Sequence, residues 1–154
     1  MNPIERRLAD AGIVLPEAPL PAANYVPAAL AGNLLFIAGQ VPFEDGKVAF
    51  VGKVGSEVTL EDGIAAARLC AINILAQAKA ALGGDLSRIQ RCLKVQGFVN
   101  CAADFLDHPK VINGASDLLV TVLGDAGKHA RFAVGAPSLP LGASVEVDAT
   151  FAVA

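Results

Sequence analysis

The sequence predicts one α+β domain in which two helices cover a mixed β-sheet. Two observations carry this prediction: two segments have apolar residues at helical spacing, and several others are alternating or continuously apolar, as strands are. In chain order we expect two strands, a short third strand, a helix, a strand, a helix and two strands. A chain of 154 residues is long enough for one core and too short for two, so one domain over residues 1–154 is expected.

Residues 1–21 form an N-terminal extension, for which we expect a short helix and the start of a connector. Asn2 can cap a helix over residues 3–11, and Gly12 follows it where a C-terminal glycine belongs. The connector is rich in Pro and Ala and covers residues 15–23.

The first strands are expected at residues 25–30 and 33–39, with a turn at 31–33 between them. Residues 34–38 are apolar on both faces, which predicts a strand that is covered on both sides, by helices on one of them. A shorter strand is expected at residues 48–51, between two glycine-containing turns.

The clearest segment is a long helix that begins with a capping box at Thr59 and ends at Gly83 and Gly84. Its apolar stripe consists of Leu60, Ile64, Ala67, Ala71, Ile74, Ala78 and Leu82. A long strand is expected next, at residues 89–100. A second amphipathic helix is expected at residues 110–123.

Two strands close the chain, at residues 130–135 and 144–153. In the first, the even positions are apolar, so Arg131 points to the opposite face among small neighbours, where it can hold a carboxylate through two parallel hydrogen bonds. In the second, apolar and polar residues alternate, and Glu146 on the polar face can orient or deprotonate a water. From periodicity alone, these two residues on adjacent strands are either a site or a simple surface ion pair.

The composition excludes several classes of protein. Hydrophobic residues make up 54% of the chain and charged residues 18%, with a mean hydropathy of +0.52, which excludes disorder. The longest uncharged run, residues 18–43, contains four prolines and does not suit a membrane helix. The basic residues near the N-terminus are not followed by an apolar stretch of signal-peptide length, so a cytoplasmic location is expected.

Charge and spacing also argue against two kinds of ligand. The net charge is −3, the pI is near 5.3 and Lys and Arg do not cluster, so nucleic acid is not an expected partner. Cys70, Cys92 and Cys101 are interpreted as reduced structural thiols. His108 and His129 lack the spacing of a zinc motif and are interpreted as polar surface residues, so no metal site is expected.

Several blocks, in the right order, resemble the reactive intermediate deaminase (Rid) family, also called YjgF-type or endoribonuclease L-PSP-like. The stretch from Arg131 to Glu146 resembles the family's signature of an Arg, a Leu-Pro turn and a Glu in a Val-Glu-Val strand. Residues 24–27 resemble its Pro-Tyr segment, residues 38–42 its Ser-Gly-Gln-x-Pro block, and residues 111–113 its helix segment with a pocket Asn. The longer N-terminus and loops resemble a divergent branch of this family.

The resemblance implies a chorismate-mutase-like α+β fold assembled as a homotrimer, with pockets at the subunit interfaces. It implies an enamine/imine deaminase that hydrolyses reactive 2-imino or 2-amino-enoic acids to 2-oxo acids and ammonia, without a metal or organic cofactor. The expected partner is a small metabolite that carries a carboxylate. In such a trimer, residues 34–38 would gain cover from a neighbouring subunit, which would account for the surplus of apolar residues.

The resemblance also assigns roles to residues. Arg131 would anchor the substrate carboxylate, and Glu146 would position water as acid or base. Ala133 would contribute backbone groups, while Ala38 and Gly39 would line the pocket. Ala133 and Ala38 stand where many relatives have Cys and Ser, so two polar side chains of the usual pocket are missing.

Two further residues have alternative interpretations. Tyr25 would line the pocket, but a single Tyr beside a proline equally suits the edge of a sheet. Asn113 would form a hydrogen bond in the pocket, or else a contact at the start of a helix. The missing Cys and Ser side chains favour an alternative function, a non-catalytic trimeric protein that binds a small carboxylate or regulates through it. An endoribonuclease is not expected, because the chain is acidic and has no basic stripe.

Overall fold

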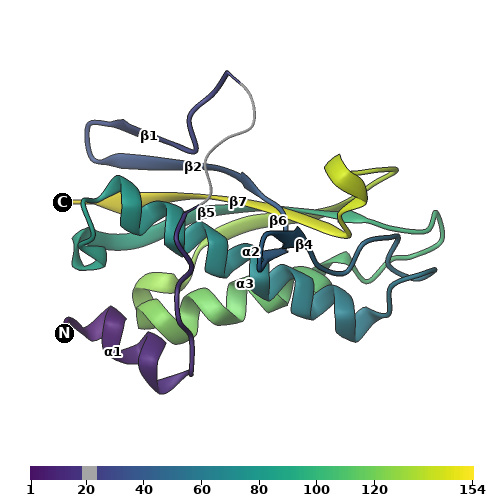
Figure 1. Cartoon of the computed structure of the whole chain (residues 1–154), viewed down its shortest axis with the longest axis horizontal. Coiled ribbons are helices and arrows are strands. Elements are labelled where there is room, and N and C mark those ends of the chain that lie inside the picture. The colour runs from purple at the N-terminus through teal and green to yellow at the C-terminus, as the bar shows by residue number, and fades with distance from the viewer. Residues whose placement is uncertain (19–23) are drawn as a thin grey trace.

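The computed structural model describes residues 1–18 and 24–154, so residues 19–23 of the expected connector lie outside the described residues. The elements are α1 (Pro3–Asp10), β1 (Ala28–Ala31), β2 (Leu34–Gln40), β3 (Phe43–Glu44), β4 (Lys47–Val48), α2 (Leu60–Ala81), β5 (Ile89–Asn100), α3 (His108–Leu123), β6 (Ala130–Ala136) and β7 (Val145–Val153). The three helices lie on one side of the main sheet (Figure 1). The predicted α+β class is confirmed.

The main sheet is mixed, as predicted, and its strands lie in the order β1-β2-β7-β5-β6. β5 and β6 are parallel, and the other neighbours are antiparallel. The prediction of a strand at residues 48–51 is wrong. β3 and β4 form a small hairpin around the expected turn at residues 44–46, where Asp45 and Gly46 have positive φ angles of 52° and 77°. The strand ends at Val48, and Phe50, with a positive φ of 58°, departs from extended backbone.

The helices begin where their caps predict. Thr59 Oγ1 accepts a hydrogen bond from the backbone N–H of Asp62 at 3.1 Å, and Asn2 Oδ1 accepts one from that of Glu5 at 2.9 Å. α3 begins at His108, two residues earlier than predicted, with a proline in its first turn. By length and composition α2 is apolar enough to cross a membrane, but it packs against both the sheet and α3, which explains its apolar residues.

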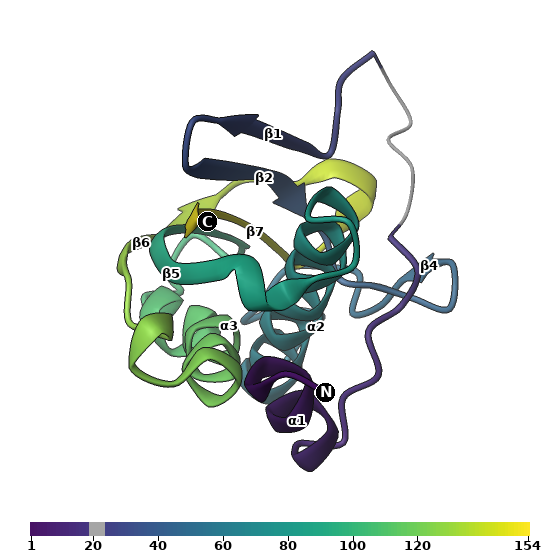
Figure 2. The ribbon, with the colours of Figure 1, turned by 90° about the vertical axis from the view of Figure 1, so that its left-hand side faces the viewer.

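The two faces of the main sheet differ in cover. The helices cover only one face (Figure 2), and the odd-numbered residues of β7 are buried against them, as the alternation predicted. β2 departs from its prediction of cover on both sides. Leu35 and Ile37 are buried under the helices, whereas Phe36, on the other face, is 44% exposed. The described residues supply helices for one face only, and we call the second face the open face.

The open face carries apolar side chains from several strands. Phe36 and Val134 are exposed, and Phe98 meets Phe132 edge to face with ring centroids 5.5 Å apart. Lys94 places its ammonium group 5.7 Å from the centre of the Phe132 ring. An apolar group of this kind on a sheet favours contact with another protein surface.

Candidate functional site

Arg131 lies on the edge strand β6, and its side chain reaches α3. Its Nη1 donates to Ser116 Oγ at 3.1 Å, and its Nη2 donates to the carbonyl oxygen of Pro109 at 3.2 Å. As predicted, Arg131 points away from the face that carries Phe132. That direction is the helix side, because Val95, its neighbour on β5, is fully buried there.

A chain of hydrogen bonds holds Arg131 in place. His129 Nδ1 lies 2.6 Å from the carbonyl oxygen of Gly127, which can only accept, so Nδ1 carries the proton and donates it. The bare Nε2 then accepts from the Ser116 hydroxyl at 2.8 Å. This direction leaves Ser116 Oγ to accept from Arg131. His129, interpreted from the sequence as a surface residue, is therefore part of the support for the guanidinium.

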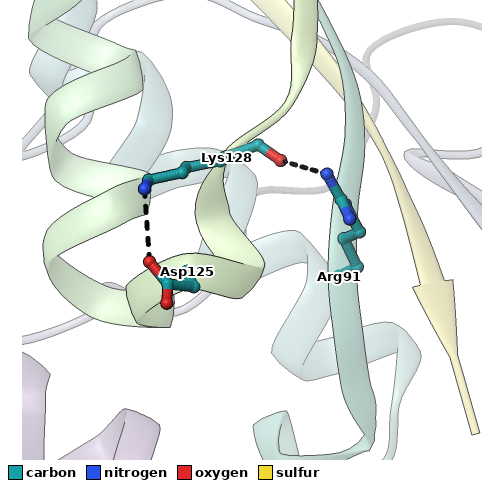
Figure 3. Close-up of polar contacts among 3 residues, drawn as sticks. All are labelled: Arg91, Asp125 and Lys128. Atoms are coloured by element: carbon teal, nitrogen blue, oxygen red, sulfur yellow. Dashed lines mark hydrogen bonds and ion pairs between the residues drawn. The ribbon is translucent and has the colours of Figure 1, made fainter.

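The turn before His129 is itself held against β5 (Figure 3). Lys128 forms an ion pair with Asp125, with Nζ and Oδ1 3.3 Å apart, and its carbonyl oxygen accepts from Arg91 Nη2 at 3.2 Å. The ion pair is exposed and adds little stability by itself. Together the two contacts fix the backbone that presents His129 and, two residues later, Arg131.

Two more predicted residues lie beside Arg131. Asn113 is exposed on α3, four residues after Pro109 and three before Ser116, so it lies on the helix face that Arg131 crosses. Ala133 is the next residue of β6 on the same side of the sheet. We call Arg131, Asn113 and Ala133 the arginine cluster.

Glu146 lies on β7 with its side chain on the open face, half-buried against β2. A side-chain Cβ at Gly39 would lie 2.6 Å from Glu146 Oε2, so the carboxylate occupies space that only a glycine leaves. The backbone N–H of Ala38 donates to the carbonyl oxygen of Pro27 at 2.9 Å. This bond ties the segment that carries Tyr25 to β2. We call Glu146, Gly39, Ala38 and Tyr25 the glutamate cluster.

Tyr25 is 55% exposed, two residues before Pro27 and ahead of the edge strand β1. An exposed ring with a polar end can contact either a ligand or a second protein surface. Packing at the sheet edge, its alternative role, does not bury it within one chain. Its position is therefore compatible with a pocket wall that a second subunit completes.

Two carboxyl groups on the open face, those of Glu146 and Asp148, have raised pKa values. Burial, and secondly the charge of Asp148, raise the pKa of Glu146 above its ordinary value. Burial also raises the pKa of Asp148, while hydrogen bonding by the backbone of Gln96 and the charge of Lys94 act in the opposite direction. A raised pKa brings Glu146 closer to neutral pH, where a general acid or base works best.

The expectation that Arg131 and Glu146 lie on adjacent strands is wrong. β5 lies between β6 and β7, and the two side chains point to opposite faces of the sheet. For the same reason they form no surface ion pair within the described chain. A single small ligand cannot touch both residues of the same subunit.

A third group of polar side chains lies where β5 ends and α3 begins. Cys101 Sγ is 3.4 Å from His108 Nε2, and both line a cavity of about 520 Å³ together with Lys53. The interpretation of Cys101 as a structural thiol and of His108 as a surface residue did not include this contact; Cys101 is free and packs against the core, and His108 is partly exposed. The signal that could have found them is a Cys and a His at the two ends of one connector.

The other two thiols are structural, as predicted. Cys70 and Cys92 are completely buried, and burial raises the pKa of both thiols, that of Cys92 to about 12. Among the described residues, no group of three or more His, Cys, Asp or Glu side chains is arranged to hold a metal ion.

Known proteins resemble this chain over nearly its whole length. Residues 5–152 match the family described as "YjgF/chorismate_mutase-like, putative endoribonuclease". Protein TCP17 of Trypanosoma cruzi is 47% identical over 139 residues, which cover 90% of this chain and 86% of TCP17.

Solved structures agree with this match. The protein Atu1372 of Agrobacterium tumefaciens, of unknown function, is 53% identical with a TM-score of 0.93, over 98% of this chain and 92% of Atu1372. The YjgF gene product of E. coli is 25% identical with a TM-score of 0.65, over 88% of this chain and 93% of that protein. The fold is that of a small α+β protein, whereas a cytoplasmic location stays a prediction. The chain therefore belongs to the YjgF (Rid) family and has its chorismate-mutase-like fold.

Proposed function

We propose that the chain is an enamine/imine deaminase that converts reactive 2-imino and 2-amino-enoic acids into 2-oxo acids and ammonia. One observation carries the proposal: the pocket residues divide into two half-sites that cannot meet within one subunit. The arginine cluster offers a cation for a carboxylate, and the glutamate cluster offers an acid or base. A complete site needs the arginine cluster of one subunit and the glutamate cluster of the next.

A ring of identical subunits supports this pairing. In a head-to-tail ring, one surface of each subunit meets a different surface of the next. The two clusters are such a pair of different surfaces, because they lie on opposite faces of the sheet. The apolar side chains of the open face supply area for the contact. On the resemblance to the family, we propose that this ring is a homotrimer with three pockets.

The two clusters can supply the groups that the hydrolysis of an imine needs. Two of the N–H groups of Arg131 bond to Ser116 and Pro109, and a guanidinium has further donors for a substrate carboxylate. Glu146 takes a proton from water as the water oxygen bonds to the imine carbon and the C=N electron pair moves to nitrogen. The nitrogen takes this proton from Glu146 to give a carbinolamine. It then takes a second proton, which the new hydroxyl group gives up through Glu146, so the C–N bond breaks and ammonia leaves as the carbonyl forms. Because an imine carbon is already electrophilic, positioning and charge suffice.

A second candidate function is binding of a small carboxylate without turnover. The observation that favours it is the pair Ala38 and Ala133, which bring no polar side chain to positions where many relatives have Ser and Cys. In this case Arg131 would bind a 2-oxo or amino acid, and Glu146 would serve only the subunit contact.

The two functions are separated by a coupled assay. A PLP-dependent dehydratase supplies the 2-imino acid, and the rate of 2-oxo acid formation is measured with and without the full-length protein. We expect acceleration, a loss of it on the order of 100-fold in Arg131→Ala, and a similar loss in Glu146→Gln. Calorimetry with a 2-oxo acid should show that Glu146→Gln still binds while Arg131→Ala does not. Binding without acceleration in the unaltered protein would establish the second function instead.

A further inference from the structure

The cavity at the junction of β5 and α3 adjoins the arginine cluster, since His108 precedes Pro109 and Gly135 follows Ala133 on the same side of β6, but it has its own set of reactive groups. Its volume is about 520 Å³, and Lys53, Cys101 and His108 all line it. Cys101 is half-buried, in contrast to the two completely buried thiols of the chain. The one accessible thiol of the described residues therefore opens into a space that can hold a small molecule.

The thiol and the imidazole are placed against each other by their surroundings. Sγ and Nε2 are 3.4 Å apart, and the ring of Phe105 packs edge to face on the His108 ring, with centroids 5.6 Å apart. Gly135 leaves room for the pair, because a Cβ at this position would lie 2.8 Å from Nε2 and 3.1 Å from Sγ. The contact is therefore supported from two sides.

Lys53 brings a cation to the same cavity. Its ammonium group donates to Asn100 Oδ1 at 3.0 Å and to the carbonyl oxygen of Pro137. Both acceptors are neutral, and a lysine ammonium has one more N–H to offer. The carboxylate of Glu57 interacts electrostatically with Lys53, but Glu57 is exposed to solvent. The cation is thus held in position at the cavity without a buried partner of opposite charge among these contacts.

We infer that Cys101, His108 and Lys53 form a reactive thiol site for small carbon electrophiles that carry an anionic group. Lys53 binds the anion, and the Cys101 S–H proton passes to His108 Nε2 as the sulfur bonds to the electrophilic carbon. With an alkyl halide, the halide leaves with the electron pair of its bond to carbon. With an imine, the C=N electron pair moves to nitrogen, which takes the proton from His108. This thiol site does not depend on the proposed hydrolysis of imines at the subunit interfaces.

The Cys101 thiol needs a neighbouring base because it is partly buried. Burial raises the pKa of the Cys101 thiol, while the charge of Lys53 and a hydrogen bond from the backbone at Ala136 act against this rise. The thiol therefore keeps its proton near neutral pH. A neighbouring imidazole that accepts this proton makes the sulfur a nucleophile at the moment of reaction.

The test compares two alkylating probes that differ in charge, the anionic iodoacetate and the neutral iodoacetamide. The full-length protein is treated under native conditions, and mass spectrometry follows each cysteine separately. Relative to N-acetylcysteine amide, a free thiol without a charged group, we expect the ratio of iodoacetate to iodoacetamide rates at Cys101 to be raised about fivefold, as one nearby cation predicts. His108→Asn should slow both reagents at Cys101, because the proton acceptor is lost. Cys70 and Cys92 should stay unmodified and so report that the protein is folded.

Two variants of Lys53 decide the outcome. Lys53→Met should return the ratio to that of N-acetylcysteine amide, and Lys53→Arg, which keeps the charge, should preserve it. Alkylation of Cys70 or Cys92 would reveal unfolding in a variant. If Lys53→Met unfolds, the rate ratio at Cys101 is compared between Lys53→Arg and the unaltered protein. The inference is overturned if Cys101 shows the ratio of the free thiol, or if His108→Asn leaves both rates unchanged.

Discussion

The arginine cluster and the glutamate cluster belong to the same sheet but are built in different ways. Arg131 is held within its own chain by Ser116 and Pro109, and Ser116 is held in turn by His129. Glu146 rests against Gly39 on the open face, where no helix covers it. One half-site is therefore preorganised before assembly, and the other depends on a partner for its cover.

This difference indicates which substitutions should impair each half-site. The arginine cluster is sensitive to changes inside the subunit, because its geometry comes from hydrogen bonds of that subunit. The glutamate cluster is sensitive to the surface around it, because the neighbouring subunit must cover it from bulk solvent and bring the arginine cluster to it. Substitutions in the two regions should accordingly fail in different ways.

The largest effect is expected from Phe36→Asp on the open face. A charge in a buried apolar contact is costly, so the trimer should dissociate and turnover should fall ~100-fold or more, while each subunit keeps its fold. Light scattering and circular dichroism measure the two properties. Val14→Asp is the matched control, because Val14 is 90% exposed but lies on the helix side. Equal dissociation in both variants would remove the distinction between the faces.

A smaller effect is expected from Gly39→Ala in the glutamate cluster. The new Cβ would overlap Glu146 Oε2, so the carboxylate must move. Because a displacement of about 1 Å can cost on the order of 100-fold in rate, kcat should fall ~10- to 100-fold with little change in KM. In a Glu146→Gln background the same substitution should cost little more, as a double-mutant cycle requires for residues that act together. Additive losses in kcat would contradict this role for Gly39.

Ser116→Ala should weaken the arginine cluster more mildly. The hydroxyl that links Arg131 to His129 is lost, but the bond to Pro109 remains. One hydrogen bond is worth about 0.5–1.5 kcal/mol, so KM should rise about threefold to tenfold with kcat nearly unchanged. Steady-state kinetics give both constants, and calorimetry gives the affinity for a 2-oxo acid. A drop in kcat alone would show that the hydroxyl acts on the chemistry rather than on binding.

The smallest effect at neutral pH is expected from Asp148→Asn. If ionised Glu146 is the base, activity falls as the pH drops through its raised pKa. Removing the charge of Asp148 takes away a cause that raises this pKa, so the acid limb of the kcat/KM profile should move to lower pH. Asp104→Asn, on an exposed turn, should leave the limb in place. A limb that moves to higher pH in Asp148→Asn would contradict the assignment.

Local signals in the sequence predicted much of the fold. The cap at Thr59, the glycines after α2 and the alternation along β7 each act over a few residues, and each element formed where its signal lies. β5 has the predicted bounds of residues 89–100. The strand after the expected turn at residues 44–46 was placed too far along the chain, because the positive φ of 58° at Phe50, a residue other than glycine, is not visible in a hydrophobic pattern.

The site was harder to predict because it depends on contacts between distant segments. Periodicity shows that Arg131 and Phe132 point to opposite faces, but not which face the helices cover. It also cannot show that β5 lies between β6 and β7, since strand order is set by pairing over long separations. The same limit concealed the Cys101–His108 contact, which forms only when the chain turns from β5 into α3.

The central claim, that each pocket takes Arg131 from one subunit and Glu146 from the next, is tested most directly by mixing two inactive variants. Arg131→Ala and Glu146→Gln chains are unfolded together and refolded at equal amounts, and native mass spectrometry confirms mixed trimers. Random head-to-tail assembly pairs the two intact halves in about one quarter of the pockets, so about one quarter of the activity should return. Mixed trimers without recovered activity would contradict the shared pocket.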